Sequence, residues 1–231
     1  MTNDRLAHTV ENAVGGIILT AQAFNPSIFS ETWLAKNEIL SSEAFEGGRV
    51  CSPEVAQFQT SAVAVMVIPP KMQITFGLED HEPEASQPLH IAARTIELLP
   101  HTPFTALGIN FDFFVSPPEH CDFNSFNRAL FGDGDSELLR EFDSPDARFG
   151  RYFSKDHEAA RLKLNIKPVR AGADAKDILL FSFNFHHDVT QLDPLEKAPH
   201  LLNALGQWSS FREYAGQLLG ISLKGQIDVE R

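Results

Sequence analysis

Histidines and carboxylates gather at the ends of two predicted strands, where they could bind a metal ion. The first group is Phe185-His186-His187-Asp188, and the second is the Glu-Asp-His-Glu run at 79–82. Imidazoles and carboxylates are the ligands of zinc and of non-haem iron. Adjacent residues on a strand point to opposite faces, so His186 and His187 cannot serve one site without a bend. No H-x-H, H-E-x-x-H or C-x-x-C spacing accompanies them. The sequence therefore predicts no metal site, and His81, His187 and Asp188 are its weak candidates.

Two further segments carry reactive or ligand-forming groups. His120 and Cys121 follow a Pro-Pro turn, and a Cys/His pair is the raw material of thiol catalysis, but adjacency does not orient a base toward a nucleophile. The loop at 132–137, Gly-Asp-Gly-Asp-Ser-Glu, alternates oxygen ligands but lacks the twelve-residue calcium pattern. No G-x-S-x-G, P-loop or G-x-G-x-x-G motif is present. We therefore predict no cofactor and no catalytic residue, and whether the protein is an enzyme stays open, with the balance against it.

Predicted strands of the second half bring polar and basic side chains to one face. Residues 105–115 alternate apolar and polar side chains, and the predicted strands 159–169 and 177–186 add lysines, an arginine and a histidine on the same side. On an acidic chain, such a surface is typical of recognition of an acidic partner. The alternative is an ordinary solvated face whose lysines prevent aggregation. The predicted partner-binding residues are Asn110, Asp112, Arg161, Lys163, Lys167, Asn184 and His186.

Two stretches of the chain share one pattern, which indicates an internal duplication. Residues 14–26 and 106–118 carry a glycine near the start, Gly16 or Gly108, and a proline at the end, Pro26 or Pro118. Each is followed by a helix-like segment, extended apolar runs and a longer helix. The predicted fold is α+β, with antiparallel sheets backed by long helices. Two β-α-β-β-β-α repeats, residues 1–104 and 105–231, would pack as one compact unit.

A pseudo-twofold axis would relate the two repeats in a saddle-like arrangement, with an insertion in the second repeat around 132–146. This topology is similar to the duplicated saddle of the TATA-binding protein, an analogy that transfers no function. The alternative is a chance similarity between common α+β patterns.

Strands of the first half carry apolar residues on both faces. A strand that is apolar on both faces must be covered twice, by the other half, by helices or by a second copy of the chain. A homodimer through the first half is therefore expected. On the side that corresponds to the polar face of the second half, these strands carry the apolar residues Ile18, Met66, Ile68, Ile74 and Phe76.

Composition limits the classes of function. The 231 residues include 19 basic and 31 acidic side chains, and this net charge of −12 opposes binding to nucleic acid. Two cysteines do not make a disulfide framework, the N-terminus lacks a signal-peptide pattern, and no apolar stretch approaches the length of a membrane span. We expect a cytoplasmic protein without a membrane partner. The 19 Phe predict an aromatic core, or alternatively a pocket for an apolar ligand.

The strings FNPSIFSETWL (24–34) and HTPFTALGINFDF (101–113) carry one resemblance. They resemble a scattered family of uncharacterised bacterial proteins of similar length, in which an F-N-P helix start and an H-T-P…A-L-G-I-N crossover recur. The resemblance implies a bacterial source and no activity.

The expected function is that of a non-catalytic interaction or scaffold subunit in a bacterial multi-protein system, with defence- or toxin-related systems among the possibilities. The alternative is a small-molecule-binding protein or hydrolase with a Phe-lined cleft between the sheet and a long helix. An enclosed, polar-tipped pocket would favour this alternative. A filled core with an exposed flat face would favour the interaction subunit.

Overall fold

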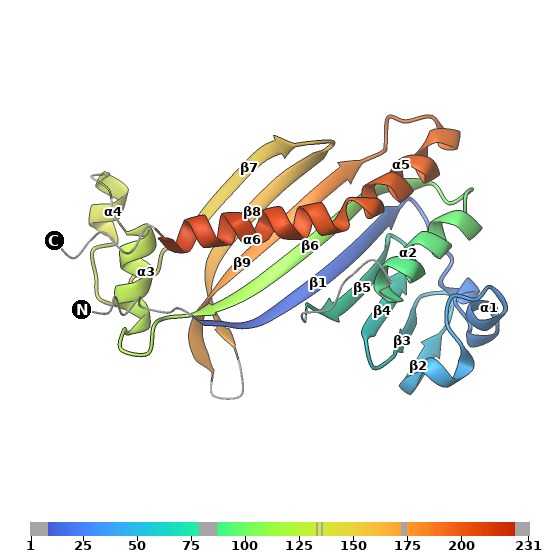
Figure 1. The fold of residues 1–231 in the computed structure, drawn as a ribbon, viewed down its shortest axis with the longest axis horizontal. Coiled ribbons are helices and arrows are strands. Elements are labelled where there is room, and N and C mark those ends of the chain that lie inside the picture. The colour runs from blue at the N-terminus through green and yellow to red at the C-terminus, as the bar shows by residue number, and fades with distance from the viewer. Residues whose placement is uncertain (1–8, 79–86, 133, 135, 172–174, 225–231) are drawn as a thin grey trace.

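The computed structural model describes residues 9–78, 87–132, 134, 136–171 and 175–224, which form one antiparallel sheet with helices (Figure 1). The prediction of an α+β fold is confirmed, and the strands join into a single sheet of nine in the order β2-β3-β4-β5-β1-β6-β9-β8-β7. The strands are β1 (Thr9–Ala21), β2 (Glu46–Cys51), β3 (Ala56–Gln59), β4 (Val63–Ile68), β5 (Lys71–Gly77), β6 (Phe104–Ser116), β7 (Arg151–His157), β8 (Ala160–Ala171) and β9 (Lys176–Asp188).

The helices are mostly short, and two of them form the C-terminal part of the described chain. They are α1 (Glu31–Lys36), α2 (Gln87–Leu98), α3 (Phe123–Phe131), α4 (Glu137–Glu141), α5 (Pro194–Gly206) and α6 (Trp208–Lys224), with 3-10 turns η1 (Pro26–Ile28) and η2 (Ser42–Ala44). The segment after β1 divides at Ser30, whose side chain accepts the Trp33 N–H at 3.3 Å and begins α1. The sequence predicts that a helix begins here at Pro26 or at a Ser30 cap, and both positions begin an element, since Pro26 starts η1 and Ser30 caps α1.

The C-terminal helix differs from its predicted form. The sequence predicts a polar loop that ends at Pro199, followed by one helix over 200–219. Instead α5 begins at Pro194, since the Asp193 carboxylate accepts the Leu195 N–H at 3.0 Å and a proline fits the first helical position. Pro199 lies inside α5, and the chain forms a separate helix from Trp208.

The core lies between the sheet and the helices α2, α5 and α6, which cover one face of it (Figure 1). Phe185 of β9 stacks on Phe211 of α6 with ring centroids 4.4 Å apart, and Trp208 contacts Phe111 of β6 at 5.2 Å. Burying each such ring stabilises the fold by roughly 1.5–3 kcal/mol. The Phe-rich composition therefore mainly fills this core, as the sequence predicts.

Strands β1 and β6 lie at the centre, and Ile17 pairs with Ile109 across them. Outward from this pair, β5, β4, β3 and β2 follow on one side and β9, β8 and β7 on the other. The sequence predicts one weaker strand or two short ones over residues 49–60, and the structure has two short strands there, β2 and β3. Strands β8 and β9, with 12 and 13 residues, are about twice as long as β4 and β5, with 6 and 7.

Candidate interaction site

The face of the sheet opposite α2, α5 and α6, which we call the open face, carries all seven predicted partner-binding residues. The strand register fixes this placement. Asn110 pairs with Asn184, Asp112 with Ser182, and Asn184 with Lys163, while His186 pairs with Arg161 and Lys167 with Leu180. Residues paired across a sheet point to the same face. The alternate residues of the same strands, such as Phe111 and Phe185, face the core.

An amide pair occupies the middle of the open face. The Asn184 Nδ2 donates to Asn110 Oδ1 at 2.7 Å, and Asn110 Nδ2 lies 3.4 Å from the Gly16 carbonyl and 3.3 Å from that of Gly108. A Cβ at Gly108 would lie 2.9 Å from Asn184 Nδ2, so glycine leaves the space that this amide fills. The pair therefore fixes the orientation of two amide side chains beside the central strands.

Basic side chains extend from this amide pair toward β7. Arg161 donates to Asp156 at 2.9 Å and to Ser154 Oγ at 2.8 Å, so its charge is already paired. Among the described residues, no carboxylate forms an ion pair with Lys163 or Lys167. These two ammonium groups are the cations of the surface that an acidic partner could neutralise.

The two adjacent histidines lie in different environments. His186 is on the open face, where partial burial and the neighbouring Lys163 lower its pKa, while Asp188 acts in the opposite direction. His187 points into the core, 1% exposed, beside Phe211 and His200. Burial, followed by the charges of His200 and His186, lowers the pKa of His187 to about 4. The two imidazoles therefore cannot converge on one ion.

The remaining metal and thiol candidates do not form a metal site among the described residues either. Asp188 accepts from the backbone N–H and the hydroxyl of Thr190 at 2.8 and 2.6 Å, which is a local turn at the strand end. His81 lies outside the described residues, as do two positions of the loop at 132–137. Burial, followed by the charge of Asp122, raises the pKa of the Cys121 thiol, which keeps it protonated. Among the described residues, no three potential ligands form a cation site.

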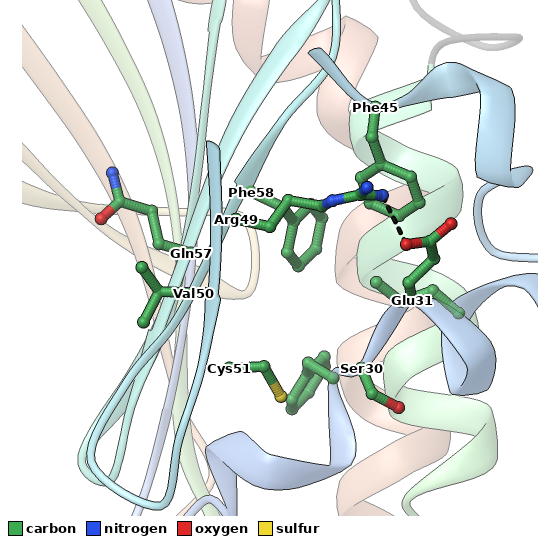
Figure 2. Close-up of a pocket in the computed structure, with 10 residues that line it drawn as sticks. Ser30, Glu31, Phe45, Arg49, Val50, Cys51, Gln57 and Phe58 are labelled. Carbon is green, nitrogen blue, oxygen red and sulfur yellow. Dashed lines mark ion pairs between the residues drawn. The ribbon is translucent and has the colours of Figure 1, made fainter. Parts of the chain in front are cut away.

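A small pocket between the β2–β3 end of the sheet and α1 was not predicted (Figure 2). Its volume is about 170 Å³, and Phe29, Phe45 and Phe58 contribute rings to its walls. An ion pair at 2.6 Å joins Arg49 to Glu31 in its wall, and the guanidinium lies 4.8 Å from the centre of the Phe45 ring. The sequence predicts a Phe-lined cleft between the sheet and a long helix, whereas this pocket lies beside the short helix α1. Residues from the three segments 29–34, 45–51 and 57–58 line this pocket, and their spacing along the chain matches no binding motif that could have indicated it.

Comparison with known proteins returns no match to a protein-family model and none to a curated protein sequence. None of the described helices is long and apolar enough to cross a bilayer.

Proposed function

We propose that this protein is a non-catalytic interaction subunit of a bacterial multi-protein system, and that it binds an acidic partner protein through the open face. The observation that carries this proposal is the convergence of seven polar or charged side chains from β6, β8 and β9 on one face. The opposite face is packed by Phe and Trp side chains, so the two faces have different roles. A filled core behind an open, polar sheet is the arrangement expected of a docking surface. We propose that this multi-protein system is cytoplasmic and that it is a defence or toxin system.

Charge reversal on the open face tests the proposal. The double variant Lys163→Glu/Lys167→Glu should fold normally, because exposed charges contribute about 0–1 kcal/mol each to stability. It should lose the partner that co-purifies with the wild-type protein from its host. The double variant Lys36→Glu/Arg94→Glu changes the net charge equally but alters α1 and α2, away from the open face, and it should retain the partner. A folded Lys163→Glu/Lys167→Glu variant that retains its partner and its biological activity would exclude this role.

Binding of a small apolar ligand is the second candidate, because the pocket beside α1 has three Phe rings and an ion pair. Its volume of about 170 Å³ suits a single ring, and it is smaller than the roughly 300–1,000 Å³ of most ligand sites. Ser30, which lines it, already caps α1 with its side chain. The pocket therefore supports binding better than hydrolysis.

We also propose that the two halves are copies of one ancestral unit related by a pseudo-twofold axis. The support is the strand order, in which β1, β5, β4 and β3 would correspond to β6, β9, β8 and β7. In this correspondence most of the additional length of the second copy lies in the long β8–β9 hairpin, and not around 132–146 as expected from the sequence. A saddle-like curvature of the sheet is part of the same proposal.

A further inference from the structure

Strand β7 lies at one edge of the sheet, and no other described strand pairs with its outer side. A two-residue loop, Glu158-Ala159, joins β7 to β8, and the closing pair is His157 with Ala160. The pair that closes such a loop exchanges both backbone hydrogen bonds, and bonded and non-bonded pairs alternate from there. The backbone N–H and C=O groups of Tyr152, Ser154 and Asp156 therefore point outward from the sheet.

The side chains of β7 have an unusual combination of chemistry for an edge. Tyr152 and Phe153 are 62% and 49% exposed. Arg151 and Lys155 flank Phe153 on the helix-covered side of the strand, and within the described chain neither forms an ion pair with a carboxylate. Arg151 lies over the Phe131 ring at 5.6 Å, and Lys155 Nζ donates to the Tyr214 hydroxyl at 2.5 Å. Charged residues alone would protect an edge from pairing, whereas two exposed aromatic rings favour it.

We propose that an extended acidic segment of another protein adds to β7 as an additional antiparallel strand. Its backbone would bond to the outward groups of Tyr152, Ser154 and Asp156, which is the main-chain recognition used in strand addition. Its side chains on the helix-covered side would alternate acidic, apolar and acidic. They would lie opposite Arg151, Phe153 and Lys155, since residues directly opposite across an antiparallel pair interact.

A second copy of this chain fits the edge poorly. Antiparallel pairing of β7 with itself would bring Arg151, Lys155 and His157 of both copies onto one row without an acidic residue among them. Like charges facing each other across strands are destabilising. This site is separate from the open face and goes beyond the function proposed above.

The peptide Thr-Asp-Thr-Val-Thr-Asp-Thr, labelled with a fluorophore at its N-terminus, tests the proposal in titrations followed by fluorescence anisotropy. It should bind saturably, and a peptide with Lys in place of both Asp should not. Ser154→Pro removes the central outward N–H without removing a backbone hydrogen bond to β8, and it should weaken binding by about tenfold or more. Ser154→Ala removes the same hydroxyl but keeps the N–H, so it should bind within about twofold of wild type.

A second variant keeps the test decisive if Ser154→Pro does not fold. Arg151→Glu/Lys155→Glu should exchange the preference, so that the Lys peptide binds and the Asp peptide does not. Lys163→Glu/Lys167→Glu, which alters only the open face, should bind the Asp peptide like wild type. Because Lys163→Glu/Lys167→Glu is expected to lose the partner of the open face and still bind the Asp peptide, the edge site and the proposed function can fail independently of each other.

Several outcomes would overturn the proposal. One is no saturable binding of the Asp peptide up to about 1 mM, the weak end of specific affinities. Others are equal binding of the Asp and Lys peptides, or equal affinities of Ser154→Pro and Ser154→Ala. A wild-type dimer that Ser154→Pro converts to a monomer would assign the edge to a second copy. Loss of binding in Lys163→Glu/Lys167→Glu alone would assign the peptide to the open face.

Discussion

At the scale of single residues, His187 has the clearest physical consequence. Its ring is buried beside Phe211 and His200, and neither ring nitrogen has a hydrogen-bond partner among the described residues. Burial therefore favours the neutral imidazole and lowers its pKa to about 4. In the unfolded chain the pKa of a histidine is about 6.5.

Stability should therefore fall as the pH falls from about 6.5 toward 4. In this window the unfolded chain binds a proton at His187 and the folded chain does not, so protonation favours unfolding. We expect the free energy of unfolding to decrease by about 2 kcal/mol between pH 7 and pH 5 from this residue, and the loss to level off below its folded pKa. The lowered pKa of His186 acts in the same direction. Urea unfolding at several pH values measures the effect.

His187→Phe is the variant that isolates this contribution. It should remove most of the pH dependence between 4 and 6.5 and leave stability at pH 7 unchanged or higher, because it replaces two unpartnered buried nitrogens. The exposed His101 provides the control, and His101→Gln should keep the wild-type pH dependence. An unchanged slope in His187→Phe would show that other groups cause it.

At the scale of elements, the adjacent glycines of β1 have different roles. Gly15 faces the core, where a Cβ would lie 2.4 Å from Phe76 Cε2 and 2.9 Å from Leu78 Cδ2. Gly16 is on the open face, where the nearest atom to a Cβ is Asn110 Cβ at 3.5 Å. A glycine inside a strand is otherwise unfavourable, so close approach of the Phe76 ring explains Gly15.

Gly15→Ala should lower the free energy of unfolding by about 1–3 kcal/mol, the usual cost of overpacking. Gly16→Ala, one residue away, meets only ordinary contacts and should change stability by less than about 0.5 kcal/mol. In the double variant Gly15→Ala/Phe76→Leu, the smaller side chain should relieve the clash, so the two effects should not add. Chemical denaturation of the wild type, the single variants Gly15→Ala, Gly16→Ala and Phe76→Leu, and the double variant measures these differences, and equal effects of the two alanines would contradict the assignment.

The sequence predicts correctly which residues of β6 face the core, but it predicts the wrong face for residues of β5. The alternation over 105–115 correctly separates Asn110 and Asp112 from Phe111. By contrast, Ile74 and Phe76 were assigned to the uncovered face, and both are buried on the core side, while Lys71, Gln73 and Thr75 lie on the open face. A period of two separates the two faces of a strand, but it does not say which face the helices cover.

At the scale of the whole molecule, fewer apolar residues of the first half lie on the open face than the sequence predicts, so a homodimer would have a smaller apolar surface to bury. The sequence predicts that the strands over 61–68 and 72–78 are apolar on both faces, but only the first, β4, is, with Ala64, Met66 and Ile68 on the open face. Ile18 of β1 lies on the same face, and Gln73 separates it from Met66. The proposed dimer would bury this smaller apolar surface.

Light scattering at micromolar concentration tests the dimer. We expect a mass twice that of the 25.7 kDa chain for the wild-type protein. Met66→Glu should convert it to a monomer, because the carboxylate would be desolvated in the interface. Lys36→Glu on α1 should not change the mass. A wild-type mass near that of one chain would exclude the dimer.

The sequence by itself determined the class of fold, most strands and the set of polar residues that share the open face. These features depend on local alternation and on turn residues, which nearby positions in the chain specify. Only the tertiary structure decided that β1 and β6 join the two halves into one sheet, that α6 covers Phe185, and that Arg49 and Glu31 meet. Each of these depends on contacts between segments far apart in the chain, and their residue spacing carries no trace of such contacts.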